Sequence, residues 1–365
     1  MCYSLTMKYL HALNKIEGVG AQKMRTLLNG FDNAENVWRA GLPDLEKILG
    51  NNKLSEKIFY EKQKINPDAE WEKLKKENIN IVEFTNPAYP LLLKQIHNPP
   101  FIIYTRGKLN FNESPAISIV GSRKFSAYGE QAATAFSRDL AKVGFTVVSG
   151  LALGIDAFAH RGALEANGKT IAVLGSSIDD DNIYPRANFS LAKEIIESGG
   201  LLMSDYSPET SATTMTFPAR NRLIAGLSLG TLIIEAGEKS GALITARMAL
   251  ESNREVFAIP GSIFSPSSCG TNNLIKSGAK LVTGVQDILE ELNFSHTAEI
   301  KQAVLKIPEN KEEEILLTIL SDIPMHIDTI AKHSDLGMSI ISSTLSMMEI
   351  KGWAKNIGGQ NYIVV

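Results

Sequence analysis

The fold class is decided by a short apolar run that ends in a glycine turn, Ile117-Ser118-Ile119-Val120-Gly121-Ser122-Arg123. A helical pattern follows over Tyr128–Val143, so the segment is typical of a strand, a tight turn and a helix. Such a turn places backbone amides and a helix N-terminus where they can hold an anion. Ser122 adds a hydroxyl donor, and Arg123 adds a guanidinium group that matches a phosphate. We therefore predict that Gly121, Ser122 and Arg123 bind phosphate.

The alternation of strand and helix continues along residues 116–292. Most of its apolar runs are apolar throughout, which is typical of strands covered on both faces. The runs are Ile117–Val120, Phe145–Ser149, Thr170–Leu174, Leu201–Ser204, Thr231–Glu235 and Val256–Ile259, and the helical patterns include Tyr128–Val143, Asp156–Asn167 and Gly241–Ser252. This alternation predicts an α/β fold with a doubly wound, Rossmann-like parallel sheet. Ligands of such sheets bind beyond the carboxyl ends of the strands.

The sequence does not match two common nucleotide-binding motifs. The pattern GxGxxG fails because Arg123 stands where a second glycine would let a pyrophosphate approach the backbone. The segment Gly168-Lys169-Thr170 resembles part of a P-loop, but here a helix precedes it and a strand follows, which is the reverse of the required order. We therefore expect no cofactor. Lys169 stays a candidate cation near the edge of the sheet.

The segment richest in candidate ligand-binding residues runs from Thr216 to Ser228. Arg220, Asn221 and Arg222 fall within one helical turn, and Phe217 lies one turn earlier. Guanidinium groups match phosphates, and an aromatic ring can stack on an unpaired base. These four side chains predict a contact with single-stranded nucleic acid.

Further helix starts with anion-binding character follow along the same chain. Lys239 and Ser240 open the helix that begins at Gly241, and a later strand ends in Pro260-Gly261. Several such turns at one sheet edge suit an extended polyanion better than a single small anion. Lys239 and Ser240 therefore join the predicted site.

An alternative interpretation is an enzyme that acts on nucleotides. Asp156 and His160 are spaced by four residues on one predicted helix, and Glu235 ends a strand, so these groups could supply acid–base chemistry. A helix cap and a packing histidine explain the first two more simply. No nucleophile sits in a known catalytic motif, so we expect a binding protein with no catalytic residue.

Two smaller domains are predicted to flank the core. Residues 1–82 show helical spacing interrupted by Ile16-Glu17-Gly18-Val19-Gly20, a turn typical of a helix-hairpin-helix or SAM-like domain. Its glycines would allow contact with a phosphate, and an ordinary helix–helix turn is equally compatible. We assign the Rossmann-like core to residues 83–295, with a proline-rich connector over 84–115, and a linker to residues 296–310.

Residues 311–365 predict three short helices and a β-hairpin, the pattern of a winged-helix domain. This segment contains four lysines, no arginine and seven acidic residues, which gives a net charge of −3. Duplex binding depends on neutralising phosphates, so such a domain is a poor reader of double-stranded DNA. A protein-contact or modulatory role fits its charge better.

Bulk composition limits the classes further. The 365 residues carry a net charge of −3, so any nucleic-acid site must be a local basic patch. The two cysteines, Cys2 and Cys269, lie far apart and form no metal-binding cluster, so we expect neither a disulfide framework nor a structural zinc, which fits a reducing cytoplasm. The chain shows no signal peptide and no apolar run long enough for a membrane span.

Several of these segments together resemble one known family, the DNA-processing protein A family (DprA, also called Smf). The resemblance lies in VGSR at 120–123, SGLALGID at 149–156, GKTIAVLG at 168–175, FPARNRLIAGLS at 217–228, EAGEKSGALITA at 235–246, and IPG and CGTNNLI at 259–261 and 269–275. These motifs occur in family order across nearly all of residues 115–292, and the flanking domains also match the family arrangement.

The resemblance implies a protein that binds single-stranded DNA, protects incoming DNA and helps load the RecA recombinase in natural transformation. It also implies a homodimer formed through the Rossmann-like core. Carried over by residue, the family's basic positions are Arg123, Lys169, Arg220 and Arg222. Two departures weaken the match: Ala219 replaces a frequent basic residue, and Ala242 in the GAL segment at 241–243 replaces a serine.

Overall fold

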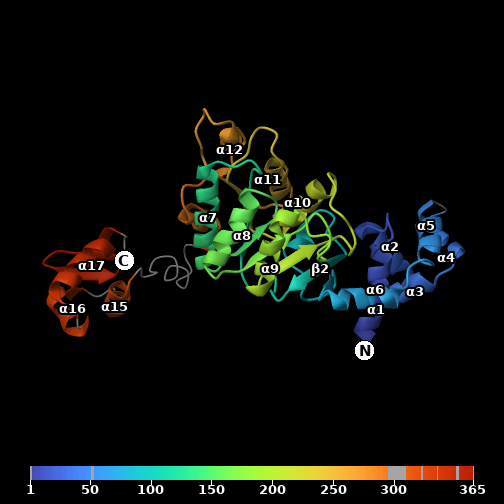
Figure 1. Ribbon diagram of the computed structural model, residues 1–365, viewed down its shortest axis with the longest axis horizontal. Coiled ribbons are helices and arrows are strands. Elements are labelled where there is room, and N and C mark those ends of the chain that lie inside the picture. The colour runs from blue at the N-terminus through green and yellow to red at the C-terminus, as the bar shows by residue number, and fades with distance from the viewer. Residues whose placement is uncertain are drawn as a thin grey trace. The chain divides into compact units, whose positions relative to one another are not determined.

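The computed structural model describes residues 2–50, 53–294, 310–321, 324–334, 336–350 and 353–364. The chain divides into two compact units, Met1–Leu292 and Asn293–Val365. The first unit holds the N-terminal helices together with the sheet, and the second holds the C-terminal domain (Figure 1). The predicted linker at 296–310 lies outside the described residues except for Asn310.

The first unit is built on a nine-stranded sheet with the order β1-β2-β6-β5-β4-β3-β7-β8-β9. Its strands are β1 (Asn80–Glu83), β2 (Ile102–Gly107), β3 (Ala116–Val120), β4 (Thr146–Ser149), β5 (Thr170–Val173), β6 (Leu201–Ser204), β7 (Gly230–Ile233), β8 (Glu255–Ala258) and β9 (Lys280–Leu281). The seven strands from β6 to β9 are parallel, while β1 and β2 are antiparallel additions. The chain order reverses between β3 and β7, which makes that point the topological switch.

Helices cover both faces of this sheet, as the apolar strands require. They are α7 (Ala127–Lys142), α8 (Ile155–Glu165), α9 (Phe189–Glu197), α10 (Thr216–Gly226), α11 (Gly241–Glu251), α12 (Cys269–Lys276) and α13 (Val285–Glu291). One core cluster packs α10 and α11 on the strands, and a second packs α8 and α9. Figure 1 shows α7 and α8 (green) side by side. The predicted Rossmann-like fold class is confirmed.

The proline-rich segment at 84–115 is better integrated than a connector would be. It contains β2, which pairs with β1 and β6 inside the sheet, and a 3-10 turn at Leu93–Gln95. Tyr89, Leu93 and Ile96 are buried in the same core as the central strands. Sequence periodicity gave no signal for β1 or for the two-residue β9.

The N-terminal helices form their own apolar cluster within the first unit. They are α1 (Cys2–Asn14), α2 (Ala21–Phe31), α3 (Ala34–Arg39), α4 (Leu42–Leu49), α5 (Lys53–Glu61) and α6 (Pro67–Lys76). The turn between α1 and α2 bends at Gly18, whose φ of 97° favours glycine. The helices α1 and α2 are thus joined through a glycine turn.

The second unit has winged-helix architecture. Its elements are α15 (Lys311–Ile319), β10 (Met325–His326), α16 (Ile327–Ser334), α17 (Met338–Ile350), β11 (Ala354–Asn356) and β12 (Asn361–Val364). The strands form a sheet in the order β10-β12-β11. Leu316, Ile330 and Leu345 of the three helices share one buried core. The three predicted helices and hairpin are confirmed, and β10 is an added short strand.

Candidate nucleic-acid interface

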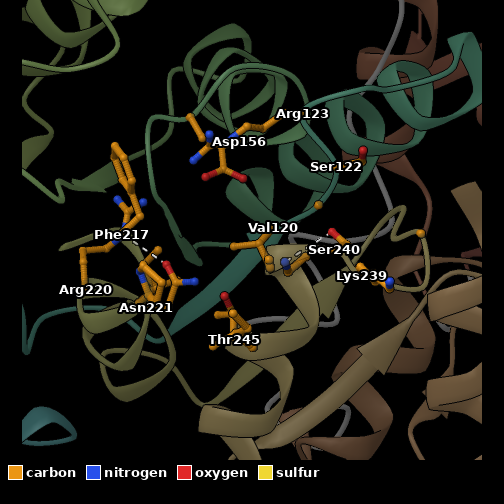
Figure 2. Close-up of a pocket in the computed structure, with 18 of the residues that line it drawn as sticks. Val120, Ser122, Arg123, Asp156, Phe217, Arg220, Asn221, Lys239, Ser240 and Thr245 are labelled. Atoms are coloured by element: carbon orange, nitrogen blue, oxygen red, sulfur yellow. Dashed lines mark hydrogen bonds between the residues drawn. The ribbon is translucent and has the colours of Figure 1, made fainter. Parts of the chain in front are cut away.

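A cleft of about 670 Å³ opens at the carboxyl ends of β3 and β7, at the topological switch. Figure 2 shows its side chains around one hollow, with Phe217, Arg220 and Asn221 on one side and Lys239 and Ser240 on the other. Eight of the ten predicted site residues line it: Gly121, Ser122, Arg123, Phe217, Arg220, Asn221, Lys239 and Ser240. The structure therefore gathers side chains from three separate segments at one sheet edge.

The turn after β3 is held firmly by its own backbone. The Ser122 amide donates to the Glu235 carbonyl at 2.8 Å, and the Ser122 hydroxyl donates to the Lys124 carbonyl at 2.6 Å. Gly121 is required here because a Cβ atom would lie 2.7 Å from the Ile155 side chain. The Ser122 hydroxyl thus shapes the turn, and it would have to leave Lys124 to donate to a ligand.

Arg123 is exposed at the mouth of the cleft and faces aromatic rings. Its guanidinium carbon lies 5.2 Å from the centroid of the Phe217 ring, within cation–π range. The Tyr184 ring centre lies 5.6 Å from that of Phe217, and all three side chains line one small hollow beside the cleft. Sequence reasoning missed Tyr184. The feature of the sequence that could have identified it is its position after β5, at the sheet edge where ligands bind.

The opposite wall is the start of α11. Ser240 caps this helix, because its hydroxyl accepts from the Ala242 amide at 3.3 Å. Lys239 is exposed beside the cap, and Thr245 lines the cleft one turn further along the helix. A helix N-terminus beside an exposed lysine favours an anion. This wall therefore complements Arg123 across the hollow.

Arg220 is part of the floor of the cleft and is 4% exposed. Its guanidinium donates to the Gly150 carbonyl at 2.8 Å and to the Val173 carbonyl, at the ends of β4 and β5. Burial lowers the pKa of Arg220 to about 10, so the group stays charged near neutrality. A Cβ atom at position 150 would lie 2.7 Å from Arg220, which explains that glycine. Arg220 therefore organises the strand ends from beneath the cleft.

The three acid–base candidates of the enzyme hypothesis are all buried, and of these only Asp156 lines the cleft. Asp156 is buried, its pKa is raised by that burial, and it accepts from the Gly150 amide at 3.1 Å. His160 is fully buried against Thr170, and burial lowers its pKa to about 3. Glu235 accepts from the hydroxyls of Ser126 and Ser267 at 2.6 and 2.9 Å. Each group serves the packing of a turn, a helix or a loop.

Lys169 is not brought to the cleft. It precedes β5, so it lies at the amino end of that strand, opposite the edge where the cleft opens. Its ammonium group is 3.8 Å from the Glu113 carboxylate. The order of helix, Lys169 and strand is already visible in the sequence, and it places this lysine before its strand, at the edge opposite the cleft.

Arg222 also faces away from the cleft, although Arg220 and Asn221 line it. It forms an ion pair with Asp205 and donates to the Asn98 carbonyl at 3.1 Å. It lines a second hollow of about 450 Å³, named here the hairpin groove, between the turn at residues 14–21 and residues 98–102 and 205–210. Consecutive helical residues point in directions about 100° apart, which explains the divergence.

Comparison with known proteins agrees with this architecture. The family model described as DNA recombination-mediator protein A matches residues 80–293, and the model described as DprA winged helix domain matches residues 301–360. The fold and site thus define a Rossmann-like nucleic-acid-handling protein with a winged-helix domain. The chain belongs to the DNA recombination-mediator protein A family, also called DprA or Smf.

Individual relatives show how far the similarity extends. Protein Smf of Synechocystis is 34% identical over 97% of this chain and 98% of its own length. DNA processing protein DprA of Bacillus subtilis is 40% identical over 60% of this chain and 73% of its own. The solved structure of DprA from Streptococcus pneumoniae matches with a TM-score of 0.68 and 36% identity, over 78% of this chain and 97% of that one.

A second solved structure also matches this chain. DNA processing protein A from Helicobacter pylori matches with a TM-score of 0.54 and 31% identity, over 60% of this chain and 97% of that one. Its description concerns a single-stranded DNA binding mode of that protein. Among the described residues of the present chain, no helix is long and apolar enough to cross a bilayer.

Proposed function

We propose that this protein binds single-stranded DNA in the cleft at the carboxyl ends of β3 and β7. The observation that carries the proposal is that two cations on the walls of the cleft are exposed and have no carboxylate partner among the described residues. Among the residues that the structure describes, neither Arg123 nor Lys239 forms an ion pair, and both are exposed on the walls of the cleft. A phosphate can therefore approach them without displacing a carboxylate.

The aromatic pair favours a single strand over a duplex. Phe217 and Tyr184 lie beside Arg123, and aromatic rings stack on bases only where these are unpaired. The winged-helix unit, with its net charge of −3 over residues 311–365, gives little support for duplex binding. The Helicobacter pylori relative, described by its single-stranded DNA binding mode, points in the same direction.

We further propose the biological role that the family suggests. The protein would protect incoming DNA and help load the RecA recombinase in natural transformation and recombination, acting in the cytoplasm as a homodimer through the Rossmann-like core. The description of the matching family as a recombination mediator supports this role. The acidic winged-helix unit would serve a protein-contact or modulatory task.

A binding role fits the geometry better than catalysis on nucleotides. His160 and Glu235 are buried and do not line the cleft. Asp156 does line it, but it is only 6% exposed and accepts from the Gly150 amide, which favours a structural role. Incubating the protein with nucleotides and analysing the products tests this point. A turned-over nucleotide would support the enzyme hypothesis instead.

The DNA-binding test compares single-stranded and double-stranded oligonucleotides of one sequence over a range of salt. Affinity for the single strand should be higher and should fall with salt, with a logarithmic slope of about −0.7 per phosphate neutralised. The Arg123→Ala variant should bind more weakly and show a shallower slope. Unchanged affinity and slope in this exposed-site variant would overturn the proposal.

A further inference from the structure

The most exposed large apolar side chains in the described part of the chain lie outside the cleft. Phe264 is 90% exposed and Ile263 is 84% exposed, at the tip of the loop formed by residues 260–268. A soluble protein gains nothing in stability from such a ring, because both its faces stay in water. The ring therefore calls for an explanation by contact with something else.

The loop that carries Phe264 is held at both ends. The Tyr128 hydroxyl donates to the Pro260 carbonyl at 3.0 Å, and Gly261 exchanges two hydrogen bonds with the Asn272 amide. At the other end, the Ser267 hydroxyl donates to Glu235 at 2.9 Å. Since the loop is already ordered, contact with the ring costs little additional backbone entropy.

The same carboxylate ties this loop to the cleft. Glu235 accepts from Ser126 as well as from Ser267, so it joins the turn after β3 to the loop after β8. The sheet order β3-β7-β8 places the turn with Arg123, the turn with Lys239 and the loop with Phe264 in succession. With strands about 4.8 Å apart, the loop starts about 10 Å from the Arg123 turn.

We propose that Phe264 is a second base-stacking platform, and that single-stranded DNA runs from the Tyr184 and Phe217 pair past Arg123 and Lys239 to this loop. This inference rests on the proposed function and extends it, because it sets the path and length of the strand. The path follows the strand ends from β5 to β8, roughly 20 Å at the usual strand spacing.

Charge along this edge favours a nucleic acid over an apolar partner. Lys124 and Lys239 are exposed between the two aromatic positions, and Arg123 lies at the cleft mouth. Glu238 is the exposed carboxylate of the β7 turn, so these four groups sum to a net positive charge. Aromatic rings alternating with cations is the pattern by which proteins track single strands.

The test measures affinity of the full chain for oligothymidylates of increasing length. The Phe264→Ala variant should match the parent on the shortest bound oligomer and lose about tenfold in affinity on long ones, the effect of one lost stacking contact. The Phe264→Trp variant keeps an aromatic ring at this position and should bind long oligomers about as tightly as the parent. Tyr60→Ala is the matched control, because Tyr60 is 57% exposed on a helix remote in sequence, and it should leave every length unchanged.

Each contrary result identifies a different failure. Equal affinity of Phe264→Ala and the parent at all lengths, with Arg123→Ala still defective, would overturn the path and leave the cleft standing. An equal loss at every length would also overturn it, because the ring would then belong to the first cleft. Unchanged DNA binding with altered light scattering would assign the ring to a contact between copies. If the Arg123→Ala variant instead bound single-stranded DNA as tightly as the parent, the proposed function itself would be contradicted.

Discussion

The cleft and the hairpin groove are both hollows of the first unit that contain cations, yet their electrostatics differ. In the groove, Lys15 contacts Glu70 and Glu209, and Arg222 contacts Asp205. On the walls of the cleft, Arg123 and Lys239 have no such partner among the described residues. A phosphate entering the groove must compete with carboxylates that are already bound, whereas one entering the cleft need not.

The contrast shows that the pairing of a cation, more than its presence, decides whether it serves binding or stability. Arg220 tests the distinction because it lies in the floor of the cleft but is buried and bonded like a structural group. The predictions below separate the two classes by measuring affinity and stability on the same variants.

The largest effect is expected for Arg220→Ala. Removing the guanidinium leaves the Gly150 and Val173 carbonyls and the buried Asp156 without their cation. Removing a buried cation that satisfies two carbonyls and opposes a nearby buried carboxyl costs about 3–5 kcal/mol, so urea denaturation should show a loss of that order. An unchanged urea midpoint would mean that Arg220 is a ligand contact like Arg123. The distinction between cations that stabilise the fold and cations that bind ligand would then fail.

The double variant Arg123→Ala with Lys239→Ala should show the opposite behaviour. Both side chains are exposed, so the free energy of unfolding should stay within about 0.5 kcal/mol of the parent. Single-stranded DNA affinity should fall by about 100-fold, the effect of two charge-assisted contacts. The salt slope should become shallower by about 1.4. A stability loss with normal affinity would contradict the assignment of these cations to binding.

Much of this architecture is predictable from sequence because the central strands are apolar throughout and alternate with helices. The position of Gly121, Ser122 and Arg123 at a strand's carboxyl end follows from the same alternation. Placing Phe217 and Lys239 near them follows from the rule that ligands bind at that edge. Such rules fix which edge a residue occupies whenever it directly follows a strand.

The remaining features depend on direction and pairing, which residue type does not reveal. The family resemblance and its charge assign Lys169 to the predicted site, but it precedes its strand. Arg220, Asn221 and Arg222 are adjacent in sequence, yet only tertiary packing shows that Arg220 is buried and Arg222 points to Asp205. Strand β1 and the integration of β2 depend on long-range antiparallel pairing, for which local periodicity gives no signal.

A smaller effect is expected for Arg222→Ala, which tests the groove. Burial raises the pKa of the Asp205 carboxyl, and the Arg222 guanidinium opposes this rise. In the variant, the burial remains and the opposing cation is gone. A buried carboxyl with a raised pKa destabilises the fold at pH values where it must ionise. The variant should therefore lose about 1–3 kcal/mol at neutral pH and recover part of it as the medium is acidified, with DNA affinity little changed. A DNA defect without a stability loss would instead place Arg222 at the ligand.

The smallest effect is expected for Glu209→Gln. Hydrogen bonds from Lys15 and Lys73 lower the pKa of Glu209 to about 2, so its ion pairs stabilise the fold above the ordinary glutamate pKa and are lost as the pH falls toward 2. The side chain is 57% exposed, so water and salt weaken the pair, and a loss of only about 0.5 kcal/mol is expected at pH 7. Thermal denaturation should show parent and variant converging in acid, because the parent's carboxylate is then neutralised. A stability difference between parent and variant that persists or grows toward pH 2 would show that Glu209 acts through its shape in the 205–210 segment. Ion pairing would then not be the property that distinguishes the groove from the cleft.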